Sequence, residues 1–113
     1  MELSYKELGD ITVVQVSGRI TLGEGDVKLR DAIYNLLKEN KGKIVLNLGD
    51  VSYIDSAGIG ELISAYTAAK RNGAELKLLN LTKKIQDILQ ITQLLTIFEV
   101  FNNENEALNS FNK

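Results

Sequence analysis

The chain has 113 residues, of which 44% are hydrophobic and 25% charged, and its formal net charge is −2 at pH 7. These values predict one globular domain and give no reason to expect a nucleic-acid partner. The chain contains neither cysteine nor histidine, which excludes disulfides, thiolate chemistry, a serine–histidine–aspartate triad and the commonest metal ligands. We therefore expect no catalytic residues, no cofactor and no metal. Carboxylate-only Mg²⁺ binding stays open, without a cluster of acidic residues to support it.

Two further patterns concern the cellular location of the chain. Residues 1–6 lack the charged-then-apolar pattern of a signal sequence. No apolar stretch approaches the roughly 20 residues that a membrane helix needs. We expect a free cytoplasmic domain without a membrane partner.

The first half of the chain predicts a hairpin, a helix and a central strand. Residues 3–8 and 11–16 are β-prone runs separated by Gly9-Asp10, which favours a hairpin. Residues 26–40 predict a helix, and residues 44–48 are apolar on both faces, as in the middle of a covered sheet. The apolar residues at helical spacing in the first helix are Val27, Leu29, Ile33, Leu36 and Leu37.

The second half predicts alternating helices and strands. A helix over about 57–72 is followed by strands at 76–81 and 96–100. Thr82 is a candidate N-cap for a short intervening helix, and Asn103 with Glu106 resembles a capping box that opens a final helix. We expect a single α/β domain with a mixed, mostly parallel sheet of four to five strands, an N-terminal hairpin and about four helices. The predicted buried stripe of the longest helix is Ile59, Leu62, Ile63 and Tyr66.

The most informative segment lies where the central strand gives way to that longest helix, and it reads Asp55-Ser56-Ala57-Gly58-Ile59-Gly60. The first N–H groups of a helix have no partner within it, and the helix dipole makes this end partly positive. A phosphate on Ser56 would be stabilised there. Alternatively, Ser56 is only an N-cap, or Asp55 is the cap and Ser56 lies one residue further in.

Two glycines in the first helical turn favour a functional interpretation. Gly58 and Gly60 each cost about 0.5–1 kcal/mol relative to alanine in a helix. Their missing side chains would leave the backbone open to close approach by a kinase-bound nucleotide or a partner surface. We therefore expect Gly58→Val to impair partner binding more than folding.

The segment resembles the phosphorylation loop of the anti-sigma factor antagonists, bacterial proteins built on the STAS domain. The resemblance covers nearly the whole chain, residues 1–113, in the order of its elements as well as in the motif. It implies that Ser56 is the phosphorylation site and that residues 55–60 bind the partner. In the family a neighbouring loop, here Thr21, Leu22 and Gly23, helps to form the partner surface. The chain departs from the family at Thr21, since an aspartate often follows Gly-Arg-Ile there.

The resemblance also implies partners. These are an anti-sigma factor that is a serine kinase with bound ATP, and a serine phosphatase that restores the unmodified state. The unphosphorylated chain would bind the anti-sigma factor and thereby release the sigma factor. It would be a monomer or weak dimer, and it would not be an enzyme.

Other readings of the chain stay open. The chain could be a non-switching scaffold subunit of a sensory assembly, or, with less support, a small nucleotide-binding protein. The run Gly23-Glu24-Gly25-Asp26 lacks the lysine and hydroxyl of a phosphate-binding loop and predicts a flexible loop before a helix. We expect Asp50 to end its strand as a turn residue. Ser52 and Ser64 are weaker phosphorylation candidates.

Overall fold

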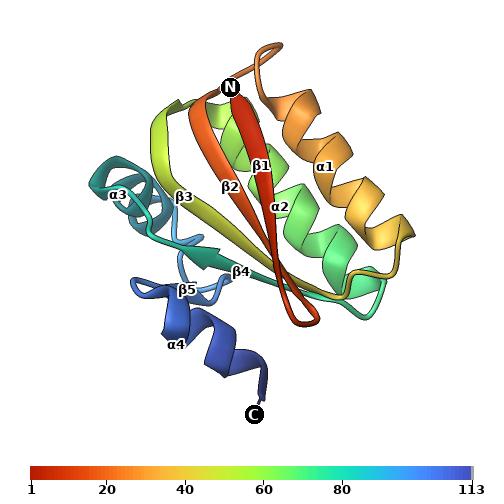
Figure 1. Cartoon of the computed structure of the whole chain (residues 1–113). Coiled ribbons are helices and arrows are strands. Elements are labelled where there is room, and N and C mark those ends of the chain that lie inside the picture. The colour runs from red at the N-terminus through yellow and green to blue at the C-terminus, as the bar shows by residue number, and fades with distance from the viewer. Residues whose placement is uncertain (113) are drawn as a thin grey trace.

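The computed structural model describes residues 1–112 and contains one mixed five-stranded sheet in the order β1-β2-β3-β4-β5 (Figure 1). β1 and β2 form an antiparallel hairpin, and the pairs β2–β3, β3–β4 and β4–β5 are parallel. This confirms the predicted mixed sheet with an N-terminal hairpin. The strands are β1 (Glu2–Leu8), β2 (Ile11–Ile20), β3 (Lys43–Ile54), β4 (Glu75–Leu79) and β5 (Val100–Phe101).

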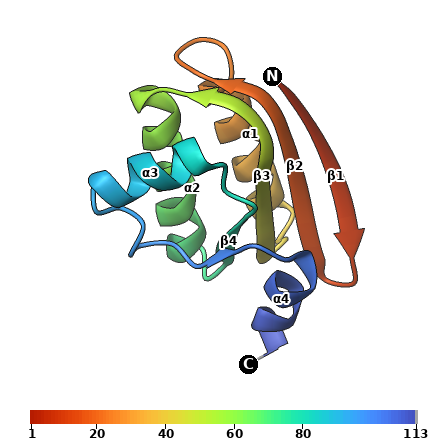
Figure 2. The ribbon, with the colours of Figure 1, turned by 90° about the vertical axis from the view of Figure 1, so that its left-hand side faces the viewer.

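Helices cover both faces of the sheet, unequally (Figure 2). α1 (Asp26–Lys38), α2 (Ser56–Arg71) and α3 (Lys83–Ile91) lie on one face. α4 (Glu104–Asn109) and a short 3-10 helix (Ser110–Asn112) cover part of the other. Within residues 1–112, no helix is long and apolar enough to cross a bilayer.

The core explains why β3 is apolar on both of its faces. Ile44, Leu46 and Leu48 are fully buried against α1 and α2, whereas Val45 joins a second cluster with Ala107 under α4. Burying such a side chain contributes about 1.5–3 kcal/mol. Since both faces of this strand are covered, its position in the middle of the sheet follows from its composition.

Several helix boundaries confirm the predicted capping. The side chain of Thr82 accepts a hydrogen bond from the Ile85 N–H (3.2 Å), and that of Asn103 accepts one from the Glu106 N–H (3.2 Å). Each satisfies an N–H that has no partner within the helix. Local sequence was sufficient here because a cap and its target lie within one turn.

The predicted ends of β2 and β3 were wrong, because both strands continue towards the candidate site. β2 runs on to Ile20 instead of ending near Val16, and β3 continues through Asp50 and Ser52 to Ile54. Residues 17–20 of β2 pair with residues 50–54 of β3 through two register shifts. Glycine accommodates one irregularity, since Gly18 has a φ of +91°. Pairing between the strands outweighs the local turn preference of Asp50.

Two smaller predictions also needed correction. The last strand is Val100–Phe101 rather than residues 96–100, although buried Phe98 packs edge-on against Tyr66 with ring centroids 5.3 Å apart. Val27 does not belong to the buried face of α1, since it is 49% exposed. In α2, Ile59 and Leu62 are buried as predicted, whereas Ile63 and Tyr66 are only half-buried.

Candidate functional site

The site is formed where the carboxyl ends of β2 and β3 lie side by side. Ile20 pairs with Ile54 at this edge, and the Asp55 N–H donates to the Ile20 carbonyl oxygen (3.3 Å). The loop after β2 and the start of α2 therefore meet, although they are far apart in the sequence. Loops at the carboxyl ends of parallel strands are the usual place for binding sites in α/β folds.

Asp55 holds the two segments together. One carboxylate oxygen, Oδ1, accepts from the Gly58 N–H (2.9 Å) and caps α2, while Oδ2 accepts from the Leu22 N–H (3.1 Å). These backbone donors, Gly58 first and Leu22 second, hold the pKa of Asp55 below its usual range. The carboxylate is thus a structural link between the α2 N-terminus and the preceding loop.

Ser56 is the first residue of α2 and is exposed. Because Asp55 supplies the cap, the alternative in which Ser56 itself is the N-cap is wrong. The cap of α2 therefore does not involve the Ser56 hydroxyl. An exposed hydroxyl at a helix N-terminus is favourably placed to carry an anion.

The two first-turn glycines differ. A Cβ on Gly58 would collide with the carbonyl oxygen of Ile20 and would lie 2.6 Å from Cγ1 of Ile54. Gly58 is therefore buried against the ends of β2 and β3, and the prediction that its backbone is open to a partner was wrong. Within residues 1–112, a Cβ on Gly60 would meet no atom within 4 Å, and this glycine is exposed.

The loop between β2 and α1 is closed by its own hydrogen bonds. The Thr21 carbonyl accepts from the N–H groups of Glu24 (3.0 Å) and Asp26 (3.4 Å). The buried Asp26 carboxylate accepts from the Gly23 N–H (3.0 Å) and the Val27 N–H (2.8 Å). As predicted, α1 begins here, with Gly25 at the N-cap position. The loop is ordered by these contacts rather than built to hold a phosphate.

The predicted site residues divide into a surface and its support. Thr21, Gly58 and Ile59 are buried, and Asp55 and Ala57 are half-buried. Exposed residues, with Leu22 at 77% exposure, form the surface that a partner can reach. We define this as the Ser56 surface; its exposed members are Leu22, Gly23, Ser56 and Gly60. Partner contact by these residues stays a prediction.

Sequence reasoning missed an ion pair that joins α1 to α2. The Arg30 guanidinium lies 2.6 Å (Nη2) and 3.0 Å (Nε) from Oε1 of Glu61, and this contact raises the pKa of Arg30. The Glu61 side chain is only 10% exposed, and its other oxygen has no hydrogen-bond partner within residues 1–112. No local spacing indicates such a contact, because the two residues belong to different helices.

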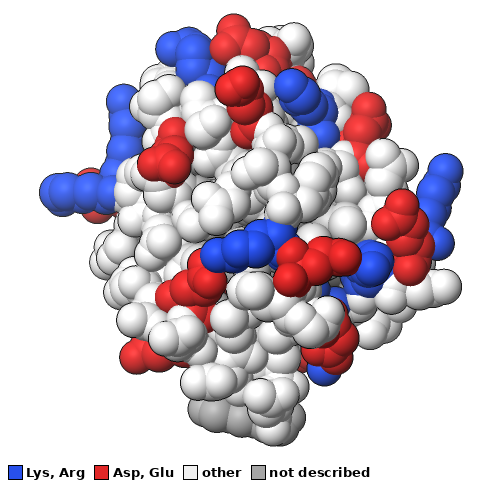
Figure 3. Space-filling model, viewed as in Figure 1, with Lys and Arg blue, Asp and Glu red and all other residues white. Residues whose placement is uncertain are grey.

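The acidic side chains do not converge. Within the described part of the chain, no group of three or more aspartate or glutamate side chains could hold a metal ion. Asp50 is exposed within β3, where it pairs with Ser17, and Asp55 is engaged by backbone N–H groups. Figure 3 shows acidic and basic side chains interspersed on the face turned to the viewer, without a broad region of one sign.

Comparison with known proteins identifies the family. The STAS domain family matches residues 2–107, and the chain belongs to this family. It is 31% identical over 87 residues to an anti-sigma-B factor antagonist of Bacillus subtilis, and this alignment covers 77% of this chain and 78% of the relative. Curated relatives of this chain are thus anti-sigma factor antagonists.

Solved structures share the fold at lower identity. A candidate anti-sigma factor antagonist from Thermotoga maritima superposes with a TM-score of 0.90 at 21% identity, covering 98% of this chain and 95% of the other. The Bacillus cell fate determinant SpoIIAA, solved in its phosphorylated form, gives a TM-score of 0.76 at 17% identity, covering 97% and 99%. At these identities, the likeness shows a common fold.

The Asp55 link predicts a specific acid dependence of stability. The pKa of Asp55 in the folded chain lies below its ordinary value of 3.8. Its stabilising contribution is therefore fully present above that value and is lost as the pH falls through the folded-state pKa. Asp55→Asn keeps an oxygen acceptor but removes the charge, so we expect its stability to fall less than that of the wild type between pH 5 and about pH 2.

Urea denaturation across this pH range measures the effect. Asp31→Asn, a change of the same kind on the exposed side of α1, is the matched control and should keep the wild-type pH dependence. If Asp55→Asn and Asp31→Asn lost stability in parallel with the wild type, the Asp55 carboxylate would not be a stabilising link.

Proposed function

We propose that this chain is an anti-sigma factor antagonist whose partner binding is switched by phosphorylation of Ser56. The observation that carries the proposal is that Asp55 and Ser56 have different roles at the start of α2. Asp55 caps the helix, which leaves the exposed Ser56 hydroxyl available at the same helix end. The resemblance of the chain to anti-sigma factor antagonists supports the same function. The chain acts as a cytoplasmic binding module and kinase substrate rather than as an enzyme.

The switch is local in this proposal. A phosphate adds about −1.5 to −2 charges at pH 7, on the residue after Asp55, whose carboxylate is bonded to the backbone of the exposed Leu22. The unphosphorylated surface has an apolar residue and an uncharged hydroxyl, which a partner can cover at low desolvation cost. The phosphorylated surface would have to lose water from a dianion, and about 1.4 kcal/mol already weakens binding tenfold. No rearrangement of the sheet or helices is required.

The partner in this proposal is an anti-sigma factor with serine kinase activity, and a serine phosphatase returns Ser56 to its unmodified state. Gly60 supports this arrangement. Its position one turn into α2 is open, so a kinase could approach the helix closely beside the acceptor hydroxyl. Fixed positioning of the attacking hydroxyl is the main requirement for phosphoryl transfer.

The experiment uses the anti-sigma factors with kinase sequences from the genome that encodes this chain. Each is mixed with the chain and ATP, and the phosphorylated product is mapped by mass spectrometry. Calorimetric titration then compares the affinity of the unmodified and phosphorylated chains. We expect one of these kinases to modify Ser56. We expect the phosphorylated chain to bind that anti-sigma factor at least about tenfold more weakly than the unmodified chain does. Equal affinity of the two forms, or a phosphate on another residue, would overturn the switch.

A further inference from the structure

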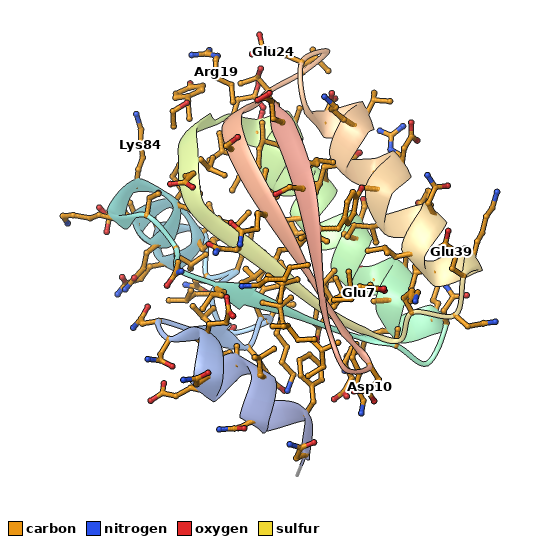
Figure 4. All side chains as sticks on the ribbon, viewed as in Figure 1. Glu7, Asp10, Arg19, Glu24, Glu39 and Lys84 are labelled. Carbon is orange, nitrogen blue, oxygen red and sulfur yellow. The ribbon has the colours of Figure 1, made fainter. Side chains whose placement is uncertain are left out.

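A second feature at this edge of the sheet is a cluster of two cations around one aromatic ring. The Arg19 guanidinium carbon lies 4.8 Å from the ring centroid of Tyr53, and the Lys84 ammonium lies 5.0 Å from it. The three residues come from β2, β3 and the first turn of α3. In Figure 4, Arg19 lies near Glu24 at the top of the view, and Lys84 lies on the left, above α3. We call these three residues the cationic cluster.

The charges of the cluster are poorly compensated by the protein itself. The ion pair of Arg19 is long, with 3.9 Å to Glu24, and both of its side chains are more than half exposed. Within residues 1–112, Lys84 takes part in no ion pair. By contrast, its neighbour Lys83 pairs with Asp87 (3.4 Å). Two positive charges are thus gathered on a chain whose net charge is −2.

The aromatic ring favours the placement of both cations at this edge. Tyr53 is 36% exposed, so its ring offers a partly open platform on which both side chains rest. Cation–π contact at exposed sites contributes about 0.5–1 kcal/mol, which offsets part of the roughly 1.5–2 kcal/mol of rotamer entropy that a lysine or arginine loses when it is ordered. A surface that is already ordered loses less conformational entropy on binding.

The cluster lies at the same edge of the sheet as the Ser56 surface. Arg19 pairs with Tyr53 at the carboxyl ends of β2 and β3, directly before the pair Ile20 and Ile54 that leads into the two loops of the site. Glu24, which lies 3.9 Å from Arg19, belongs to the loop that carries Leu22. Arginine and tyrosine are enriched in protein interfaces, and here both lie at the edge of the sheet whose loop carries the exposed Leu22. A protein segment therefore fits this surface better than a small anion does.

We infer that the cationic cluster docks an acidic segment of the partner protein, an inference that rests on the proposed function for the identity of that partner. Aspartate or glutamate side chains of the segment would complement the uncompensated charges of Arg19 and Lys84, while the partner covers Leu22 and Ser56. Exposed charge pairs at the rim of an interface act mainly on the association rate and are weakened by salt. The cluster thus selects an acidic partner and accelerates its approach.

The test compares two charge reversals that differ by one position. Lys84→Glu reverses a charge of the cluster, whereas Lys83→Glu makes the same change in net charge away from Tyr53, on a side chain that is 89% exposed. Both substitutions place glutamate in the first turn of α3, where the helix dipole favours it, so we expect both variants to fold. We expect Lys84→Glu to weaken binding of the anti-sigma factor at least about tenfold, mostly through slower association, and Lys83→Glu less than about threefold. Similar affinities of the two variants would overturn the proposal.

A second measurement tests whether the cationic cluster binds acidic side chains in the absence of the anti-sigma factor. A hexaglutamate peptide is titrated into the ¹⁵N-labelled chain, with a hexalysine peptide as the control for sign. We expect hexaglutamate to shift the amide signals of Arg19, Tyr53 and Lys84, and these shifts to vanish in Lys84→Glu and at high salt. If the peptide causes localised shifts but no anti-sigma factor binds the chain, the proposed function is overturned and the docking surface is supported. Binding of an anti-sigma factor without localised peptide shifts would overturn the docking surface alone.

Discussion

Ser56→Ala should abolish phosphorylation of the chain while leaving its fold almost unchanged. Asp55 performs the capping, and alanine at the first helical position has the higher helix propensity, so the melting temperature should stay close to that of the wild type. The variant should bind the anti-sigma factor, which is the kinase in this proposal, with the affinity of the unmodified wild type whether or not ATP is present. Incorporation of labelled phosphate and calorimetric titration measure the two effects.

Ser56→Asp tests the sign of the switch. Its added charge at the α2 N-terminus is compatible with the helix dipole, so it should fold well and yet bind the partner about tenfold more weakly. Ser64→Asp, the same change at an exposed serine further along α2, is the matched control for net charge and should bind normally. Tight binding by Ser56→Asp beside loss of binding by a folded Ser56→Ala would contradict the switch.

Gly58→Ala should destabilise the fold strongly, whereas Gly60→Ala should not. The added methyl group at Gly58 collides with the Ile20 carbonyl oxygen and with Ile54, neither of which can move without disturbing the end of the sheet. Overpacking of this kind costs about 1–3 kcal/mol, and the backbone contact places Gly58 at the upper end. Gly60→Ala meets open space and removes a helical glycine, so it should stabilise the chain by about 0.5–1 kcal/mol.

Urea unfolding of the two alanine variants measures this difference. If Gly58→Ala folded as stably as Gly60→Ala, the packing of α2 against the β2 and β3 ends would be looser than the structure indicates. Partner affinity gives a second readout, because the Gly60→Ala methyl group lies on the surface that a kinase would approach. Retention of stability with weaker binding in Gly60→Ala would identify it as the glycine that matters for function.

Local sequence determined the order and type of the elements. The hairpin at Gly9-Asp10, the helices capped by Thr82 and Asn103, and the serine at the start of α2 all follow from residues within one turn of each other. Such features depend on backbone preferences and on hydrogen bonds over a few residues, which a single sequence displays. The class of fold then follows from the alternation of strands and helices.

The tertiary structure alone decided what each residue of the site does. The sequence offered both Asp55 and Ser56 as the cap of α2, and the structure assigns it to Asp55, whose second oxygen also reaches the Leu22 N–H across the β2–β3 edge. Gly58 and Gly60 are alike in sequence, but only Gly58 lies against another strand. The Arg30–Glu61 ion pair and the cationic cluster likewise join separate elements. The pairing of β2 with β3 and the packing of α1 and α3 beside them set these contacts, and no local pattern encodes distances between residues so far apart in the chain.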